Sequence, residues 1–375
     1  MLRLVQFFLI AGLLVSPAFA DDTPALVFDA KTGAVLHSEH ANALWFPASL
    51  TKLMTTYVAF KAIKAGQVSL DTQLTISVRA LAEPPSKMGM PVGATISLGD
   101  ALEILIVKSA NDLAVAIAEG VGGSVEQFVQ RMNETAATLG MVDTRFVNPN
   151  GLPAHEQVTT ARDLALLTSA LIREFPQYGD MFALKAVKVG KRNLRSHNPL
   201  LGKYDGADGM KTGFICASGY NLIASATRNG RRIVAVVLGA SSNKTREDRT
   251  IRLLDDAFSG KEKNQFLPGT LAQVERASAD ATLATHMGPV VCKKRYPAGR
   301  DAYAIDVQLQ RAAEERDRIK AAKADIEENG PAGSLPMALA ATAPLPQVVE
   351  RLNASPPVKG KLAPGIPLPA LRPAR

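Results

Sequence analysis

The sequence is poor in the residues that build metal and nucleic-acid sites. Its 375 residues include five histidines and two cysteines, and the histidines show no spacing typical of metal ligands. Aromatic residues make up 5% of the chain and do not interleave with basic clusters, so we expect no nucleic-acid partner. No metal or other cofactor is expected, and any chemistry would therefore rest on the chain's own side chains.

Long apolar runs are also scarce. One runs from Leu4 to Val15, after Arg3, and Ala18-Phe19-Ala20 follows it as a signal-peptidase pattern. We therefore expect residues 1–20 to be a secretory signal peptide, with an uncleaved anchor as the alternative. No other run is long and apolar enough to span a bilayer.

What the chain does contain is an ordered set of three polar motifs, the first of which is Ser49-Leu50-Thr51-Lys52. It opens an apolar-periodic stretch that is typical of a helix. Because residues three apart share a helix face, Ser49 Oγ and Lys52 Nζ can meet. A serine becomes a good nucleophile when a base accepts its proton, and burial beside another cation favours the neutral, basic form of lysine. The alternative is a helix-capping serine followed by an exposed lysine.

The second motif is Ser109-Ala110-Asn111, which joins two apolar stretches, 100–108 and 112–119, that we predict to be helices. A polar pair at such a junction can line a cleft, with Ser109 passing a proton to a leaving group and Asn111 bonding a substrate amide. A helix cap is the alternative, and both roles can hold together.

The third motif is Lys211-Thr212-Gly213, which precedes two β-rich runs, 220–226 and 232–238, joined by the hairpin signal Asn229-Gly230. A strand beside a cleft can pair with an extended peptide. Lys211 and Thr212 would then supply a cation and a hydroxyl for a carboxylate, and Gly213 would permit close approach.

Each motif has a second copy elsewhere in the chain, and order and context decide between the copies. Lys31-Thr32-Gly33 lies between two strand-like runs and predicts a hairpin turn, Ser196-His197-Asn198 predicts a loop, and Ser241-Ser242-Asn243-Lys244 lacks the downstream partners. The ordered set 49–52, 109–111 and 211–213 predicts a serine acyltransferase that uses lysine as its base.

Residues 24–258 resemble a low-molecular-mass penicillin-binding protein, specifically a serine-type D-alanyl-D-alanine carboxypeptidase. The likeness extends beyond the three motifs to segments that surround them. These are Asp29 to Leu36, Pro47 to Met54, Phe146 to Leu152, Thr160 to Leu164, and Lys211 to Phe214 followed by Ser218 to Asn221.

The resemblance implies a role for each motif residue. Ser49 would be the acylated nucleophile and Lys52 its base, while Ser109, Asn111, Lys211, Thr212 and Gly213 would complete the site. The backbone N–H groups of Ser49 and Phe214 would form the oxyanion hole. The expected partners are peptidoglycan stem peptides, from which the terminal D-alanine would be removed, and β-lactams, which would acylate Ser49. The expected location is the periplasm.

One position departs from the family, which usually has a hydroxyl residue where this chain has Ile215.

Three alternative functions stay open. An endopeptidase acting on D-alanyl cross-links would use the same chemistry. A serine β-lactamase would need a deacylating glutamate, and Glu156 lacks the expected E-x-x-L-N context. A non-catalytic cell-wall-binding protein would make the intact motifs coincidental.

Composition divides the chain into four regions, the first of which is the expected signal peptide at 1–20. Residues 21–260 would form one α/β (α+β) transpeptidase-like domain, an antiparallel sheet flanked by helices, with further helices near 124–139, 161–174 and 244–258. Residues 261–330 would form a small module, β-like at 289–292 and 303–307 and then a charged helix over 310–328. Residues 331–375 hold 10 of the 23 prolines and read as a disordered tail.

Two further expectations concern membrane anchoring and the state of the two cysteines. The 310–328 run has too few large apolar residues for an amphipathic membrane anchor, so membrane anchoring is doubtful. Cys216 and Cys292 are the chain's two cysteines, and we favour two separate buried thiols over a disulfide, although an exported chain meets oxidants.

Overall fold

The structure is a computed structural model that describes residues 23–261, 269–277, 284–297, 300–309 and 312. The predicted signal peptide at 1–20 and the predicted tail at 331–375 lie outside these residues. All but one residue of the charged run 310–328 lies outside them as well.

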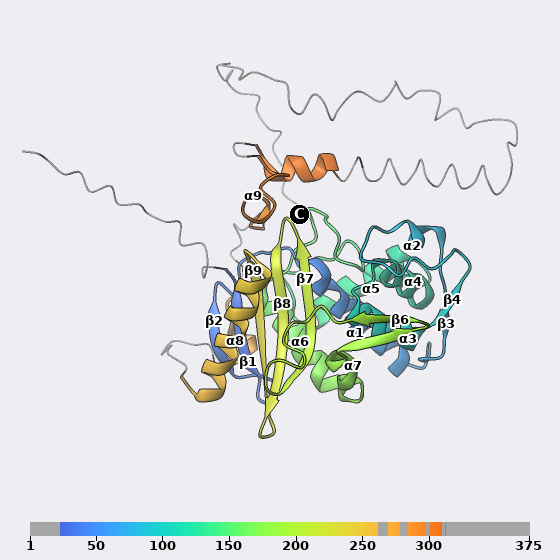
Figure 1. Cartoon of the computed structure of the whole chain (residues 1–375). Coiled ribbons are helices and arrows are strands. Elements are labelled where there is room, and N and C mark those ends of the chain that lie inside the picture. The colour runs from blue at the N-terminus through green and yellow to red at the C-terminus, as the bar shows by residue number, and fades with distance from the viewer. Residues whose placement is uncertain (1–22, 262–268, 278–283, 298–299, 310–311, 313–375) are drawn as a thin grey trace, which may run out of the picture. The chain divides into compact units, whose positions relative to one another are not determined.

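A five-stranded antiparallel sheet forms the centre of the catalytic region, with the order β2-β1-β9-β8-β7 (Figure 1). Its strands are β1 (Ala25–Asp29), β2 (Val35–Glu39), β7 (Ala207–Ile215), β8 (Gly219–Arg228) and β9 (Arg231–Ala240). The two predicted hairpins are confirmed, since Lys31-Thr32-Gly33 lies in the turn before β2 and Asn229-Gly230 joins β8 to β9. The order places β7, which carries the third motif, at an edge of the sheet.

Both faces of the sheet are covered by helices, which confirms the predicted fold class. Alternate residues of the strands point to opposite faces, so Val27, Ala235 and Val237 pack with Leu254 of α8 (Asn243–Ser259). Their neighbours Leu26 and Val236 join the larger core on the other face. That core includes buried residues of α1 (Thr51–Lys64) and α6 (Ala161–Glu174).

A mostly helical part lies beside the sheet and carries the second motif. Side-chain caps begin several of its helices, and the helices predicted near 124–139, 161–174 and 244–258 are confirmed as α5, α6 and α8. The remaining elements are α2 (Val78–Ala82), α3 (Leu98–Val107), α4 (Asn111–Gly122), α5 (Val125–Thr138), η2 (Pro176–Tyr178), α7 (Gly179–Ala183), and two small hairpins, β3 (Gln73–Thr75) with β4 (Thr95–Ser97) and β5 (Ala186–Val189) with β6 (Arg192–Arg195).

The strands predicted at 289–292 and 303–307 are wrong. The chain instead forms α9 (Gly288–Val291) and a helix over 302–309, after the short helical turn η3 (Leu271–Gln273). Pro289 suits the first turn of a helix, and the Asp301 carboxylate accepts the Tyr303 N–H at 2.9 Å as an N-cap. Short apolar runs do not distinguish strand from helix, and here the caps decide.

The prediction of two separate thiols is also wrong. Cys216 and Cys292 form a disulfide with a Cα–Cα distance of 5.7 Å. Their approach depends on a backbone contact that periodicity does not reveal, because the Met287 N–H donates to the Ala217 carbonyl at 2.8 Å. The disulfide therefore ties the turn after β7 to the segment that follows residue 284.

Candidate active site

Ser49 lies in a one-turn helix, η1 (Ala48–Leu50), immediately before α1. The preceding residue, Ala48, has φ 48°, an uncommon conformation for a residue with a side chain. Gly151 lies so close that a Cβ there would be 1.9 Å from the Ala48 carbonyl oxygen. The neighbouring loop therefore needs glycine at this point to pack against the turn that presents Ser49.

Lys52 is fully buried on the first turn of α1, and its Nζ lies 3.2 Å from Ser49 Oγ. Two acceptors also face this nitrogen: Asn111 Oδ1 at 2.8 Å and the Asn150 carbonyl at 2.5 Å. A neutral amine has two hydrogens, which these two acceptors satisfy. Its lone pair is then left for the proton of Ser49, as a general base requires.

The surroundings of Lys52 favour that neutral form. Burial lowers the pKa of Lys52 well below its usual value, and the positive charge of Lys211 lowers it further. Burial also lowers the pKa of Lys211 to about 7, with Arg246 adding to the effect. The two lysines thus affect each other, and the useful state is a neutral Lys52 beside a charged Lys211.

Ser109 lies between α3 and α4 with φ 60°, so its backbone is held in the left-handed region. Lys211 Nζ donates to Ser109 Oγ at 3.0 Å and to the Thr212 carbonyl at 2.8 Å. The first bond links the second and third motifs. Because Ser109 Oγ accepts this bond, its own hydroxyl proton stays available for a group bound in the cleft.

Asn111 begins α4 and is fixed on both sides of its amide. Its Oδ1 accepts from Lys52, and its Nδ2 donates to the Pro84 carbonyl at 2.8 Å. The next residue, Asp112, is fully buried and accepts the backbone N–H groups of Met88 and Gly89. This carboxylate therefore anchors the 84–89 loop beside the cleft.

The third motif brings β7 against the nucleophile turn. A Cβ on Gly213 would lie 3.2 Å from the Ser49 backbone nitrogen and 3.1 Å from the Pro47 carbonyl. Glycine therefore permits the close approach of β7 to the turn that presents Ser49. The Phe214 side chain is 42% exposed and packs on Tyr220 at a ring-centroid distance of 4.3 Å.

These residues border a cleft of about 580 Å³. Ser49, Ser109, Asn111, Thr212, Gly213 and Phe214 all line it, so the structure brings the three predicted motifs together. Lys52 and Lys211 lie beneath its surface and reach it through Ser49 and Ser109. The lining includes the cation Arg246, and none of the described residues that line the cleft is an aspartate or glutamate. The positive charge of this lining favours anionic ligands.

Two cleft residues were missed by the sequence analysis. Arg246, near the start of α8, is 5% exposed, and its Nε has no hydrogen-bond partner among the described residues. A buried guanidinium facing a cleft is suited to a carboxylate. Burial, with the charges of Lys211, Lys108 and Arg246, lowers the pKa of His197 to about 4, so this imidazole is neutral near pH 7.

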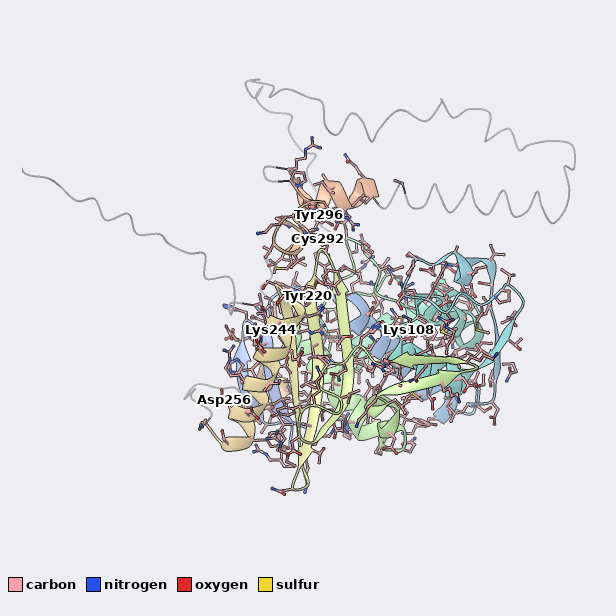
Figure 2. The ribbon with its side chains drawn as sticks, viewed as in Figure 1. Lys108, Tyr220, Lys244, Asp256, Cys292 and Tyr296 are labelled. Atoms are coloured by element: carbon pink, nitrogen blue, oxygen red, sulfur yellow. A yellow bond between two sulfur atoms is a disulfide. The ribbon has the colours of Figure 1, made fainter. Side chains whose placement is uncertain are left out.

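The second copies of the motifs are structural, as predicted. Ser242 caps α8 through its bond from the Thr245 N–H, and the exposed Lys244 pairs with Asp248 at 2.7 Å. Asn198 donates to the Gly209 carbonyl at 2.8 Å and so supports the start of β7. Tyr220, at the beginning of β8, lies toward the end of the sheet where Cys292 is attached (Figure 2).

Within residues 23–261, 269–277, 284–297 and 300–309, no three His, Cys, Asp or Glu side chains form a group that could hold a metal ion. Over the same part of the chain, the helices are too short or too polar to cross a bilayer.

Comparison with known proteins agrees with this geometry. A family profile described as D-alanyl-D-alanine carboxypeptidase (peptidase family S11) matches residues 15–242. The D-alanyl-D-alanine carboxypeptidase DacC of Escherichia coli is 37% identical over 240 residues, which are 62% of this chain and 60% of that protein. The chain spans less than two thirds of the length of the curated carboxypeptidases it matches.

Two other relatives broaden the comparison. A D-alanyl-D-alanine endopeptidase of Pseudomonas aeruginosa is 33% identical over 63% of this chain and 76% of that protein. Penicillin-binding protein D2 of Listeria monocytogenes, solved with cefotaxime bound, is 32% identical with a TM-score of 0.58. That match covers 63% of this chain and 97% of the Listeria chain.

Proposed function

Because the chain belongs to the D-alanyl-D-alanine carboxypeptidase family, we propose that it removes the terminal D-alanine from peptidoglycan stem pentapeptides through an acyl-enzyme on Ser49. The observation that carries this proposal is the pairing of Ser49 with a buried lysine whose two other partners are both acceptors. That arrangement supports a neutral Lys52 that can take the serine proton.

Acylation begins when Lys52 Nζ accepts the proton of Ser49 Oγ as this oxygen attacks the carbonyl carbon of the scissile bond. The developing oxyanion is bound by the backbone N–H groups of Ser49 and Phe214, donors that matter most in the transition state. Ser109, held by Lys211, gives its hydroxyl proton to the departing amine and regains a proton from Lys52, which returns to its neutral form. D-Alanine leaves, and the remaining peptide stays as an ester on Ser49.

Substrate recognition is assigned to the residues that surround this centre. The peptide lies along the edge of β7 in the manner of strand addition, and the Asn111 side chain contacts its amide. The free carboxylate of the terminal D-alanine binds near Lys211, Thr212 and Arg246. Arg246 provides a cation in a cleft where Ile215 replaces the family's usual hydroxyl.

Water then hydrolyses the ester and restores Ser49. β-Lactams imitate the D-alanyl-D-alanine end and would acylate the same serine without rapid release. A β-lactamase role is disfavoured because Glu156 pairs with Arg145 at 2.8 Å, its side chain is 66% exposed, and it does not line the cleft. The exported mature protein would act on peptidoglycan in the periplasm.

Cleavage of D-alanyl cross-links is the second candidate. One relative with this description is 33% identical to the chain, and the two reactions share the same bond type. They differ in whether the cleft admits a second peptide strand on the leaving side.

A time course with two substrates separates these candidates. The purified protein is incubated with a D-Ala-D-Ala-terminated muropeptide and with a cross-linked muropeptide dimer, and the products are followed by mass. We expect loss of one alanine from the pentapeptide. Cleavage of the dimer alone would instead assign the endopeptidase reaction, and inertness toward both substrates would contradict the proposed enzyme.

A further inference from the structure

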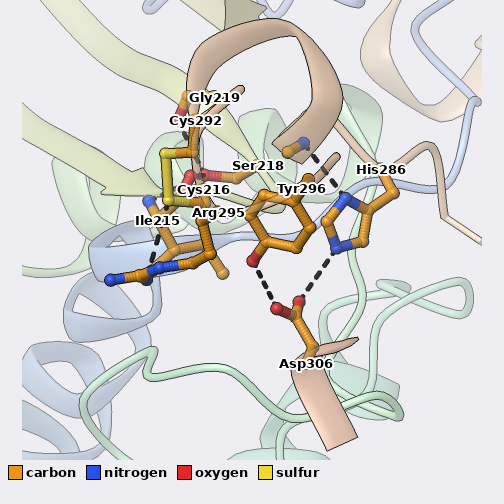
Figure 3. Close-up of a disulfide and its surroundings, with 10 residues drawn as sticks. Ile215, Cys216, Ser218, Gly219, His286, Cys292, Arg295, Tyr296 and Asp306 are labelled. Carbon is orange, nitrogen blue, oxygen red and sulfur yellow. Dashed lines mark hydrogen bonds and ion pairs between the residues drawn. A yellow bond between two sulfur atoms is a disulfide. The ribbon is translucent and has the colours of Figure 1, made fainter. Parts of the chain in front are cut away.

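Residues 284–309 lie outside the matched family profile, which ends at residue 242, yet they attach beside the cleft. The Cys216–Cys292 disulfide joins α9 to the turn that follows β7. Figure 3 shows this disulfide next to a small cluster of polar and aromatic side chains. Of the described ranges after residue 261, 284–297 and 300–309 make up what we call the tethered segment.

The tethered segment has a well-bonded interior. His286 Nε2 donates to Asp306 Oδ2 at 2.9 Å, and His286 Nδ1 accepts the Gly288 N–H at 3.0 Å. Tyr296, 4% exposed, donates its hydroxyl to the other oxygen of Asp306. These bonds join α9 to the helix over 302–309 (Figure 3). These hydrogen bonds fix the conformation of the tethered segment, which can therefore hold neighbouring side chains in place.

This segment reaches the active site through two residues that flank the oxyanion hole. Phe46 lies three residues before Ser49, and its ring contacts those of His286 and Tyr303, each at a centroid distance of 6.0 Å. Ile215 follows Phe214 and packs in the same apolar cluster as Phe46 and Tyr303. Ile215 also lines two spaces at once: the catalytic cleft and a smaller cavity that Asp306 borders.

The direction of the substrate decides which part of it faces this cluster. In the proposed function, on which this inference rests, the terminal carboxylate binds near Lys211 and Thr212. The scissile carbonyl lies at the N–H groups of Ser49 and Phe214. The peptide on the other side of the scissile bond therefore continues along β7 past Ile215, toward the tethered segment.

We propose that the tethered segment is a specificity element. Through the buried Phe46 it supports Ile215, which lines the cleft, as the wall of the subsite for the stem peptide N-terminal to the scissile bond. The ligand class is an extended stem peptide whose penultimate residues pack against this apolar wall. The disulfide joins Cys216, the residue after Ile215, to Cys292 and so holds the tethered segment beside this wall. Tyr303, through its contacts with Phe46 and its hydroxyl bond to the Ala284 carbonyl, transmits that position.

The test compares ligands that do and do not reach the wall. The variants are Tyr303→Ala and the pair Cys216→Ser with Cys292→Ser, with Lys293→Ala as an exposed control in the same segment. Each is assayed for D-alanine release from an N-acylated L-Lys-D-Ala-D-Ala peptide. Each is also assayed for the acylation rate with 6-aminopenicillanic acid, a β-lactam without an acyl side chain.

We expect the first two variants to lose about ten- to a hundredfold in kcat/KM for the peptide, because small displacements of positioning groups have effects of that size. Their acylation by 6-aminopenicillanic acid should stay within about twofold of the parent, as should both rates of the control. Equal losses with both ligands would show a general structural role and overturn the inference, as would unchanged rates with both. Failure of the parent protein to react with either ligand would instead contradict the proposed function.

Discussion

The starts of α1 and α8 carry the same four-residue pattern but hold their lysines in opposite environments. Lys52 is fully buried next to Lys211, and its pKa is lowered, mainly by burial. Lys244 is exposed at the surface, and its hydrogen bond to Asp248 raises its pKa. Lys52 lies 3.2 Å from Ser49 Oγ, whereas Lys244 is paired with an aspartate. Only the tertiary environment favours a neutral amine, and so only one copy is equipped for catalysis.

Removing the nucleophile is the most severe way to test this comparison. Ser49→Ala should abolish covalent labelling by a fluorescent penicillin, because it removes the oxygen that pairs with the buried base Lys52. Ser241→Ala, which changes the matching serine of the second copy, should label like the parent, since Ser241 does not line the cleft. A gel of labelled protein gives the result, and circular dichroism confirms that the variants are folded. Persistent labelling of Ser49→Ala would point to a different nucleophile.

The next prediction concerns the two lysines themselves. Lys52→Gln keeps N–H donors for Asn111 and the Asn150 carbonyl but cannot accept a proton, so acylation by benzylpenicillin should slow by about 10²- to 10⁴-fold. The matched variant Lys244→Gln should acylate at the parental rate. Stopped-flow acylation kinetics measure both. A Lys52→Gln protein with parental kinetics would remove the lysine from the mechanism.

The two Lys-Thr-Gly copies sharpen the comparison in the same way. A methyl on Gly213 would press on Pro47 and Ser49, whereas a Cβ on Gly33 would meet nothing within 4 Å. Gly213→Ala should therefore slow acylation by about tenfold through a displaced oxyanion hole.

Gly33→Ala is the control for that change. Gly33 has φ 71°, so alanine there should lower the free energy of unfolding by about 1–2 kcal/mol. Its acylation rate should match that of the parent. Denaturant unfolding and acylation kinetics separate the two effects, and equal acylation by both glycine variants would argue against the close approach of β7.

The smallest expected effect is a shift in pH dependence. The charge of Lys211 lowers the pKa of Lys52, so Lys211→Gln should raise it. More Lys52 is then protonated at a given pH, and the acid limb of the acylation profile moves to higher pH. Rates measured between pH 5 and 9 give the midpoint independently of the maximal rate. A midpoint that stays in place or moves to lower pH would contradict the coupling of the two lysines.

Much of this site could be predicted from the sequence because side chains at short spacings carry it. Ser49 with Lys52, and Ser109 with Asn111, each lie on one helix turn or junction, and the motif order supplied the long-range pairing with Lys211. The same reasoning identified the sheet, since its strands alternate or run apolar between clear turns such as Asn229-Gly230.

The features that were missed depend on contacts without a spacing signal. The partner that Asn150 offers Lys52 is a backbone carbonyl, which no residue type reveals. Arg246 lies 35 residues after Lys211 on another element. Arg249 of the same helix is equally buried but pairs with Glu39, whereas Arg246 lines the cleft. The Cys216–Cys292 disulfide depends on the path of the chain after residue 284, where short apolar runs were taken for strands.

The central claim is that Ser49, and not the serine of the second copy, is acylated. The parent protein is exposed briefly to benzylpenicillin, digested with trypsin and analysed by mass. We predict the adduct on the peptide Thr32 to Lys52, which contains Ser49. An adduct on the peptide Ile233 to Lys244, which contains Ser241 and Ser242, or the absence of any adduct, would contradict the account.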